Sequence, residues 1–161
     1  LEPLVHEALA RWQAAGVIVP SAEQITVGIQ DLPGHLLGSA SGRTIWIDAN
    51  AAGWGWFVDA TPADDREFTQ PGDQGEQNRM DLLSVVMHEL GHLLGYDHED
   101  EGVMEVTLVP GIRNTEQDSN GAAVADLLYG QANDHREHAW LGAWLNQATE
   151  STQAYRGRRS R

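Results

Sequence analysis

The stretch HELGHLLGYDH at residues 88–98 constrains the fold of this chain more than any other feature of the sequence. His88 and His92 are four residues apart, so on an α-helix they project from one face and both imidazoles can reach a single ion. A third ligand can join them only after the chain turns sharply. Gly95 permits that turn because glycine enters left-handed backbone space freely, and His98 can then return to the same point. The stretch therefore predicts a helix, a glycine break and a metal site that spans the break.

The types of ligand indicate which metal this site takes. The chain has no cysteine, so any metal must be held by nitrogen or oxygen. Three histidines with an open fourth position are typical of a catalytic zinc site. Glu89 directly follows the first histidine, where its carboxylate can reach a water on the metal and act as a general base. We therefore predict one catalytic zinc ion held by His88, His92 and His98, with Glu89 as the base.

A short H-E-x-x-H pattern can occur by chance in an unrelated helix, so this interpretation depends on the surrounding residues. The pattern lies in an apolar helical stripe, Gly95 stands at the break, and Met104 follows shortly downstream. The remaining histidines have no such surroundings, and we expect them to be solvated side chains rather than ligands. They are His6, His35, His135 and His138.

Length and charge narrow the class of protein. A chain of 161 residues is long enough for one domain with its own core. The formal net charge of -14 argues against partners such as nucleic acid or anionic membranes, which would repel it. No apolar run approaches the ~20 residues that span a bilayer, so we expect a soluble, monomeric domain. The chain begins without a basic and apolar leader, so a signal peptide would be already removed or would belong to a longer parent chain.

The spacing of the apolar residues predicts a sheet-like first half and a helical second half. The predicted helices cover residues 4–16, 78–94, 122–130 and 134–150. The predicted strands cover residues 25–30, 35–40 and 43–48, and residues 53–59 could add a further short strand. The inward side of the first helix is expected to consist of Leu4, Val5, Ala8, Leu9 and Trp12.

Residues 88–98 also match every fixed position of the H-E-x-x-H-x-x-G-x-x-H signature of the metzincin zinc peptidases, and Met104 fits the methionine turn of that clan. Within the clan the chain most resembles the matrixins, because Met104 follows His98 closely and a later segment ends in LLYG at 127–130. Upstream, the runs LLGSA and TIWID are similar to the matrixin edge strand and its neighbour. The chain also resembles matrixin-like modules of large bacterial secreted proteins, which is consistent with a domain excised from a larger multidomain protein.

The resemblance implies an α+β fold of the zincin type. A small twisted, mostly parallel sheet with an antiparallel edge strand would pack on the opening helix and the active-site helix, and C-terminal helices would follow. It further implies a single catalytic domain at 1–150, with an upper sheet part at 1–94 and a lower part after Gly95 at 95–150. The basic tail at 151–161 is expected to be unordered.

The resemblance also implies a function, that of a secreted or cell-surface zinc endopeptidase whose zinc-bound water is activated by Glu89. An extended protein or peptide substrate would add a strand to the sheet edge, and the segment after Met104 would form the wall of an apolar pocket. Met104 itself would lie beneath the metal as an apolar floor. The residues assigned to substrate binding on this basis are Leu36, Leu37, Gly38, Ser39 and Ala40 of the edge strand and Leu108, Val109 and Ile112 of the wall.

Two other classes of protein remain open from the sequence. One is an extracellular binding module that keeps zinc without turnover, although such a module has no need of a base such as Glu89. The other is a zinc hydrolase that acts on a non-peptide substrate. Calcium could also bind to acidic side chains in the first half of the chain, but they lack the regular spacing of a calcium loop and we do not favour it. These acids are Asp48, Asp59, Asp64, Asp65 and Asp73.

The sequence thus generates a prediction about metal content. Elemental analysis of the undenatured protein should find about one zinc ion per chain, because one group of three imidazoles is expected to converge and no thiolate is available. Two firmly bound zinc ions per chain, or none after dialysis against zinc, would contradict it.

Overall fold

A computed structural model of the chain describes residues 1–69, 75–115 and 138–142, and of 138–142 only the backbone. The helical elements are α1 (Glu2–Ala14), the 3-10 turn η1 (Ala22–Gln24), α2 (Arg66–Thr69), α3 (Leu82–Leu93) and the 3-10 turn η2 (Gly102–Met104). The strands are β1 (Thr26–Gln30), β2 (Leu36–Ser41), β3 (Thr44–Asp48), β4 (Trp56–Phe57), β5 (Met80–Asp81), β6 (Thr107–Leu108) and β7 (His138–Gly142). None of the helices in these described ranges is long and apolar enough to cross a membrane.

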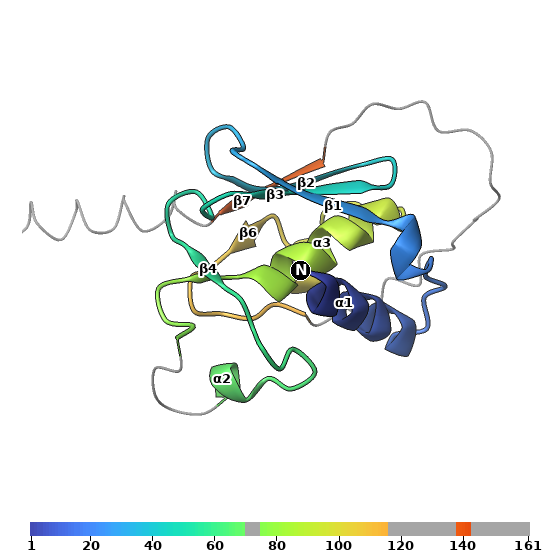
Figure 1. The fold of residues 1–161 in the computed structure, drawn as a ribbon, viewed down its shortest axis with the longest axis horizontal. Helices are drawn as coiled ribbons and strands as arrows, with labels where there is room; N and C mark the ends of the chain where they lie inside the picture. Colours follow the sequence, from blue (N-terminus) through green and yellow to red (C-terminus); the bar gives the residue numbers. More distant parts are fainter. Residues whose placement is uncertain (70–74, 116–137, 143–161) are drawn as a thin grey trace, which may run out of the picture.

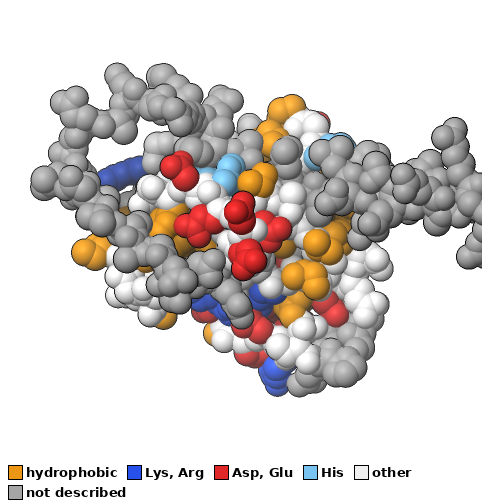
Figure 2. Space-filling model, turned by 180° about the vertical axis from the view of Figure 1, so that it is seen from behind, with side chains coloured by type: hydrophobic (Ala, Val, Ile, Leu, Met, Phe, Trp, Pro, Cys, Tyr) orange, Lys and Arg blue, Asp and Glu red, His pale blue; other side chains and the backbone are white. Residues whose placement is uncertain are grey.

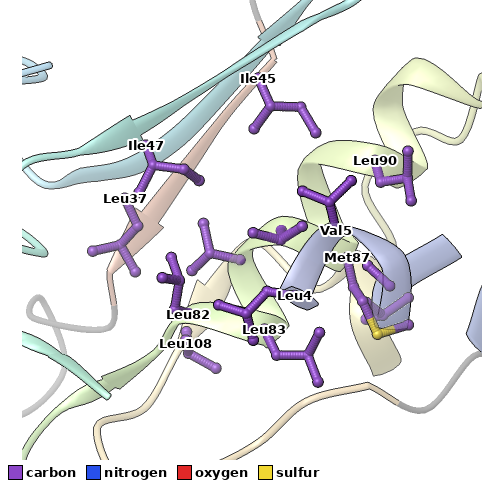
Figure 3. Packing of buried hydrophobic residues seen from close by; sticks show 14 of the residues in the cluster. Leu4, Val5, Leu37, Ile45, Ile47, Leu82, Leu83, Met87, Leu90 and Leu108 are labelled. Carbon is purple, nitrogen blue, oxygen red and sulfur yellow. The ribbon is translucent and has the colours of Figure 1, made fainter. Parts of the chain in front are cut away.

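The two long helices lie on one face of the main sheet (Figure 1). α3 packs against β2 and β3, and α1 packs against α3. Figure 3 shows how apolar side chains from both helices and the sheet face one another in the space between them. The five α1 residues expected to face inward are all buried, which confirms the periodicity of the first helix. The core therefore fixes α3 between the sheet and α1.

The main sheet has the strand order β1-β3-β2-β7-β6. β1 pairs with β3 and β6 pairs with β7 in parallel, whereas β2 pairs with both β3 and β7 in antiparallel fashion. The three strands expected at 25–48 are present, but the sheet is mixed, so the expectation of a mostly parallel sheet was wrong. The expected edge strand, β2, is not at an edge, because β7 lies beside it. The short strand expected within 53–59 is β4, which pairs with β5 in a separate two-stranded sheet.

The last helix expected from the sequence was wrong over the part that the structure describes. Residues His138–Gly142 form β7 rather than the middle of a helix at 134–150. The segment is short, and its tryptophan and leucine suit either a helix or a strand, so pairing with a neighbouring strand can override local preference. The helix expected at 122–130 and the tail at 151–161 lie outside the described residues. The division into upper and lower parts stays a prediction.

A buried ion cluster fixes the start of α3. Asp81 caps the helix, because its Oδ2 accepts hydrogen bonds from the Ser84 backbone N–H at 3.1 Å and the Ser84 hydroxyl at 2.7 Å. The same carboxylate accepts two hydrogen bonds from Arg113, at 3.0 and 2.9 Å. Arg113 also forms ion pairs with Asp59 at 2.8 Å and Asp65 at 2.9 Å. Burial alone would lower the pKa of Arg113, but these carboxylates outweigh it and raise the pKa. Arg113 therefore stays charged and ties three segments together.

Removal of this arginine should destabilise the fold strongly. Arg113→Met would leave the carboxylates of Asp59 and Asp81 buried without their cation, and breaking a buried pair in this way typically costs about 3–5 kcal/mol. Urea denaturation would measure the free energy of unfolding. The matched control is Arg66→Met, which removes an exposed partner of Asp64 and should change stability little. Equal losses in the two variants would contradict the role of the cluster.

Candidate metal centre

Three histidines converge at the C-terminal half of α3 and in the segment that follows it. His88 and His92 lie on the same face of the helix, with their Nε2 atoms 3.0 Å apart. The Nε2 of His98 lies 3.2 Å from that of His92. One ligand atom from each of the three residues lies within 4.8 Å of those of the other two. The structure therefore brings together all three residues that the sequence predicted as ligands.

The turn that returns His98 to the site is built at Gly95, where the backbone has a φ of +92°. The Gly95 N–H donates to the His92 carbonyl at 3.1 Å and the Tyr96 N–H donates to the Gly91 carbonyl at 3.0 Å. This pair of hydrogen bonds is the Schellman arrangement, which requires left-handed backbone at the residue after the helix cap. The Tyr96 ring packs on the Trp12 ring of α1, with centroids 4.8 Å apart. The glycine break predicted from sequence is thus confirmed and held against the core.

Backbone carbonyls orient two of the imidazoles. The Nδ1 of His88 lies 2.8 Å from the carbonyl oxygen of Val103, and the Nδ1 of His92 lies 2.9 Å from that of Tyr96. A carbonyl can only accept, so each Nδ1 donates its proton, and in a neutral ring the Nε2 then presents a lone pair. Both rings are therefore oriented with Nε2 toward a common point. No sequence pattern marks these two carbonyls, because every residue has one.

The donor set fits zinc. Two ligand nitrogens at 2.0–2.1 Å from a tetrahedral zinc ion would lie about 3.3 Å apart, close to the 3.0 and 3.2 Å separations of the Nε2 atoms. Neutral imidazoles without a thiolate also suit this metal. Within residues 1–69 and 75–115, this is the group of three side chains with metal-binding geometry. His88, His92 and His98 would hold the ion.

The carboxyl group of Glu89 lies in the core next to the first histidine. Glu89 is 0% exposed, and neither Oε1 nor Oε2 has a hydrogen-bond partner among the described residues. Burial raises the pKa of this carboxyl group well above its usual range. A buried polar group without a partner is costly and marks a position where a ligand, water or ion belongs. The carboxyl oxygens of Glu89 are therefore available to exchange a proton with a water molecule or ligand that binds beside them.

β2 approaches Glu89 so closely that only glycine fits at one position. A Cβ atom built on Gly38 would lie 2.6 Å from the Oε1 of Glu89 and 2.7 Å from its Cγ. The backbone of β2 thus forms a wall over the carboxyl group. The sequence assigned Gly38 only to the edge strand, although a glycine inside a strand can mark such a close approach.

The segment around Met104 packs against α3 next to the site. Met104 is 2% exposed, and a Cβ atom on Gly91 would collide with its sulfur atom and lie 2.9 Å from Trp12. The side-chain amide of Asn114 donates to the Gly102 carbonyl at 2.7 Å and so holds this turn in place. Met104 therefore packs against α3 at Gly91, and its expected role as an apolar floor beneath the metal stays a prediction.

The residues expected to bind substrate fall into two groups. Leu37 and Leu108 are 0% and 1% exposed and belong to the hydrophobic core, so they are poorly placed to contact a substrate. Val109 and Ile112 are 44% and 52% exposed. Within the rest of β2, Gly38 and Ala40 are buried and Leu36 and Ser39 are half-buried. The roles of all these residues in binding stay predictions.

Acidic side chains surround the exposed end of the site. Figure 2 shows acidic side chains gathered beside histidine on one face of the molecule. The segment that contains His98 contributes Asp97, Glu99, Asp100 and Glu101, all of them exposed. Their negative potential favours the approach of a cation. The other acids considered for calcium have protein partners, since Asp48 accepts backbone N–H groups and Asp59, Asp64 and Asp65 pair with arginines. Asp73 lies outside the described residues.

An α+β domain in which one helix carries two histidines and a buried glutamate, and the segment after it carries a third histidine, defines the class of protein. The comparison with known families identifies it further. The family model described as Matrixin matches residues 33–130, which is more than half of the chain and includes the whole candidate metal centre. The chain therefore belongs to the matrixin family of peptidases. No curated protein and no solved structure matches the chain.

The geometry separates the expected effects of two substitutions on metal binding. His98→Ala removes one of three ligands and should weaken zinc binding by more than about 100-fold. That is the largest loss of metal affinity usually seen when a residue hydrogen-bonded to a ligand is removed, and losing the ligand itself should cost more. Glu89→Ala leaves the three imidazoles in place and should keep the metal. Equilibrium dialysis against zinc would measure both, with the exposed His6→Ala as the matched control. Unchanged zinc affinity in His98→Ala would place the third ligand elsewhere.

Proposed function

We propose that this domain is a zinc-dependent endopeptidase that hydrolyses peptide bonds in extended protein substrates outside the cell. Membership of the matrixin family supports peptidase chemistry. The observation that carries the proposal is the pairing of three converging imidazoles with Glu89, whose buried carboxyl oxygens have no hydrogen-bond partner among the described residues. A module that only holds zinc has no use for such a residue, because burial without a partner destabilises the fold.

The chain's own residues divide the work of hydrolysis. When bound, zinc would supply Lewis acidity to the attacking water and to the scissile carbonyl. Glu89 takes a proton from that water as its oxygen bonds to the carbonyl carbon. The same carboxyl group then gives the proton to the leaving nitrogen as the C–N bond breaks, so Glu89 ends the cycle unchanged. The position of Glu89, buried beside His88 and without a hydrogen-bond partner among the described residues, leaves its carboxyl oxygens available for both proton transfers.

We infer where a substrate would bind from the arrangement of the sheet. An extended peptide could pair with β2 only in place of β7, and its backbone would then lie next to Gly38, the residue whose Cβ would collide with Glu89. Backbone pairing of this kind gives affinity with little dependence on sequence. The extracellular location is supported by the resemblance to modules of secreted proteins. Hydrolysis of peptide bonds in an extended chain therefore fits this arrangement better than hydrolysis of a non-peptide substrate.

Digestion of casein tests the proposed activity. Zinc-loaded protein should cleave casein, a chelator should stop the cleavage, and added zinc should restore it, because the imidazoles hold the metal that the reaction needs. Gel electrophoresis and mass spectrometry would report the fragments. Absence of cleavage in every variant, with zinc bound, would favour a binding module instead.

The role of Glu89 can be measured in the same assay. Glu89→Ala should lower kcat by about 10²–10⁴-fold, the usual contribution of general acid–base catalysis, while zinc content stays the same. The matched control is Glu101→Ala, which removes an exposed carboxylate from the acidic segment and should retain activity. Near-normal turnover by zinc-loaded Glu89→Ala would show that another group is the base.

A further inference from the structure

The chain's own C-terminal segment lies where an extended peptide would pair with β2. β7 runs between β2 and β6 and is hydrogen-bonded to both. Along β2, Ser39 pairs with Ala139 and Ala40 pairs with His138, in antiparallel orientation. Along β6, Thr107 pairs with Leu141 in parallel orientation. The edge expected to receive a substrate is thus covered by residues His138–Gly142.

The backbone of β7 lies next to the part of β2 that approaches Glu89. Gly38 is opposite Trp140, and Gly38 is the residue whose Cβ would collide with Glu89. Neighbouring strands are about 4.8 Å apart, so the main chain near Trp140 lies one strand spacing from the strand that touches the base. β7 also approaches α3, the helix that carries Glu89 and two of the histidines. A substrate strand and β7 would therefore compete for the same backbone groups.

The pairing of β7 has the features of an exchangeable strand. Its contact with β6 covers two residue pairs, Thr107–Leu141 and Leu108–Gly142, and its register with β2 shifts between Leu36 and Gly38. Backbone pairing is tolerant of sequence, so an incoming peptide can make the same hydrogen bonds. A segment on the same chain nevertheless has an advantage over a free peptide, because its binding is intramolecular.

We propose that residues His138–Gly142 act as an intramolecular pseudosubstrate, which occupies the groove between β2 and β6 and must leave before a protein substrate can bind. This inference rests on the proposed peptidase function and adds its regulation. The occupant blocks binding rather than chemistry, because Glu89 and the histidines stay in place beneath it. Release of the segment should therefore lower KM and leave kcat unchanged.

Proline substitution within β7 tests the proposal in the full-length chain. Ala139 pairs with β2, and Leu141 pairs with both β2 and β6. Ala139→Pro and, independently, Leu141→Pro each remove an N–H and fix φ within this short strand, which should release it from the sheet. If the groove is closed in about nine molecules of ten, opening it should lower KM about tenfold. Ala139→Ser keeps the backbone N–H and should keep the KM of the parent chain. Thermal unfolding of each sample would show that the variants are folded.

A binding measurement separates this proposal from the peptidase function. The probe is a fluorescent blocked peptide of sequence HAWLG, with a scrambled peptide as its control, and zinc-loaded Glu89→Ala protein prevents its cleavage. The peptide should bind the Glu89→Ala, Ala139→Pro double variant about tenfold more tightly than Glu89→Ala alone, because the groove is then open. If the peptide binds the double variant more tightly but no variant cleaves casein, the peptidase function is rejected, while occupation of the peptide-binding position by β7 is supported.

Two results would overturn the proposal while leaving the peptidase function intact. One is a lower kcat or loss of folding in both proline variants with no decrease in KM, which would make β7 a permanent part of the sheet. The other is equal binding of the HAWLG peptide to folded proteins with and without Ala139→Pro. Either result, together with chelator-sensitive cleavage of casein by the parent chain, assigns the failure to the pseudosubstrate alone.

Discussion

The burial of α3 is the constraint on which the rest of the structure depends. Every residue from Leu82 to Gly91 is buried, although three of them, Ser84, His88 and Glu89, carry polar side chains. Glycines permit this depth, because a Cβ at Gly91 would strike Met104 and Trp12 and one at Gly38 would strike Glu89. The helix therefore carries its reactive residues into the core, where a low dielectric strengthens every charge interaction.

Both ends of α3 are fixed by interactions that also define the metal centre. At its start, Asp81 joins the helix to Arg113. The next residue, Asn114, donates to the Gly102 carbonyl and so holds the turn there. The carbonyl that follows in this turn, that of Val103, orients His88. At its end, the Gly95 turn places the Tyr96 carbonyl against His92 and returns His98 to the site. The ligands are thus oriented by the same groups that stabilise the helix, so losses of stability and of metal affinity should be coupled there.

Local spacing explains what the sequence could and could not predict. The α1 stripe, the strands at 25–48, the glycine break and the convergence of His88, His92 and His98 depend on residues close together in the chain, and they were predictable. The Arg113 cluster joins segments from Asp59 to Arg113, and no short pattern predicts such a distant pairing. β7 was mistaken for a helix for a related reason, because the backbone edge of β2 decides its conformation and that edge is remote in sequence.

Pairing with β7 also satisfies backbone groups of β2 that would otherwise be exposed. Without β7, β2 would present a row of unpaired N–H and C=O groups, which invites pairing with any exposed strand, including another copy of the chain. Binding of an extended substrate, as proposed above, nevertheless requires that edge to become available. Pairing with His138–Gly142 satisfies the same backbone groups that a substrate would satisfy, so exchange replaces one set of hydrogen bonds with another. The difference in free energy between the covered and substrate-bound states is then small compared with the energy of either pairing, and a modest change in the segment shifts the balance between them.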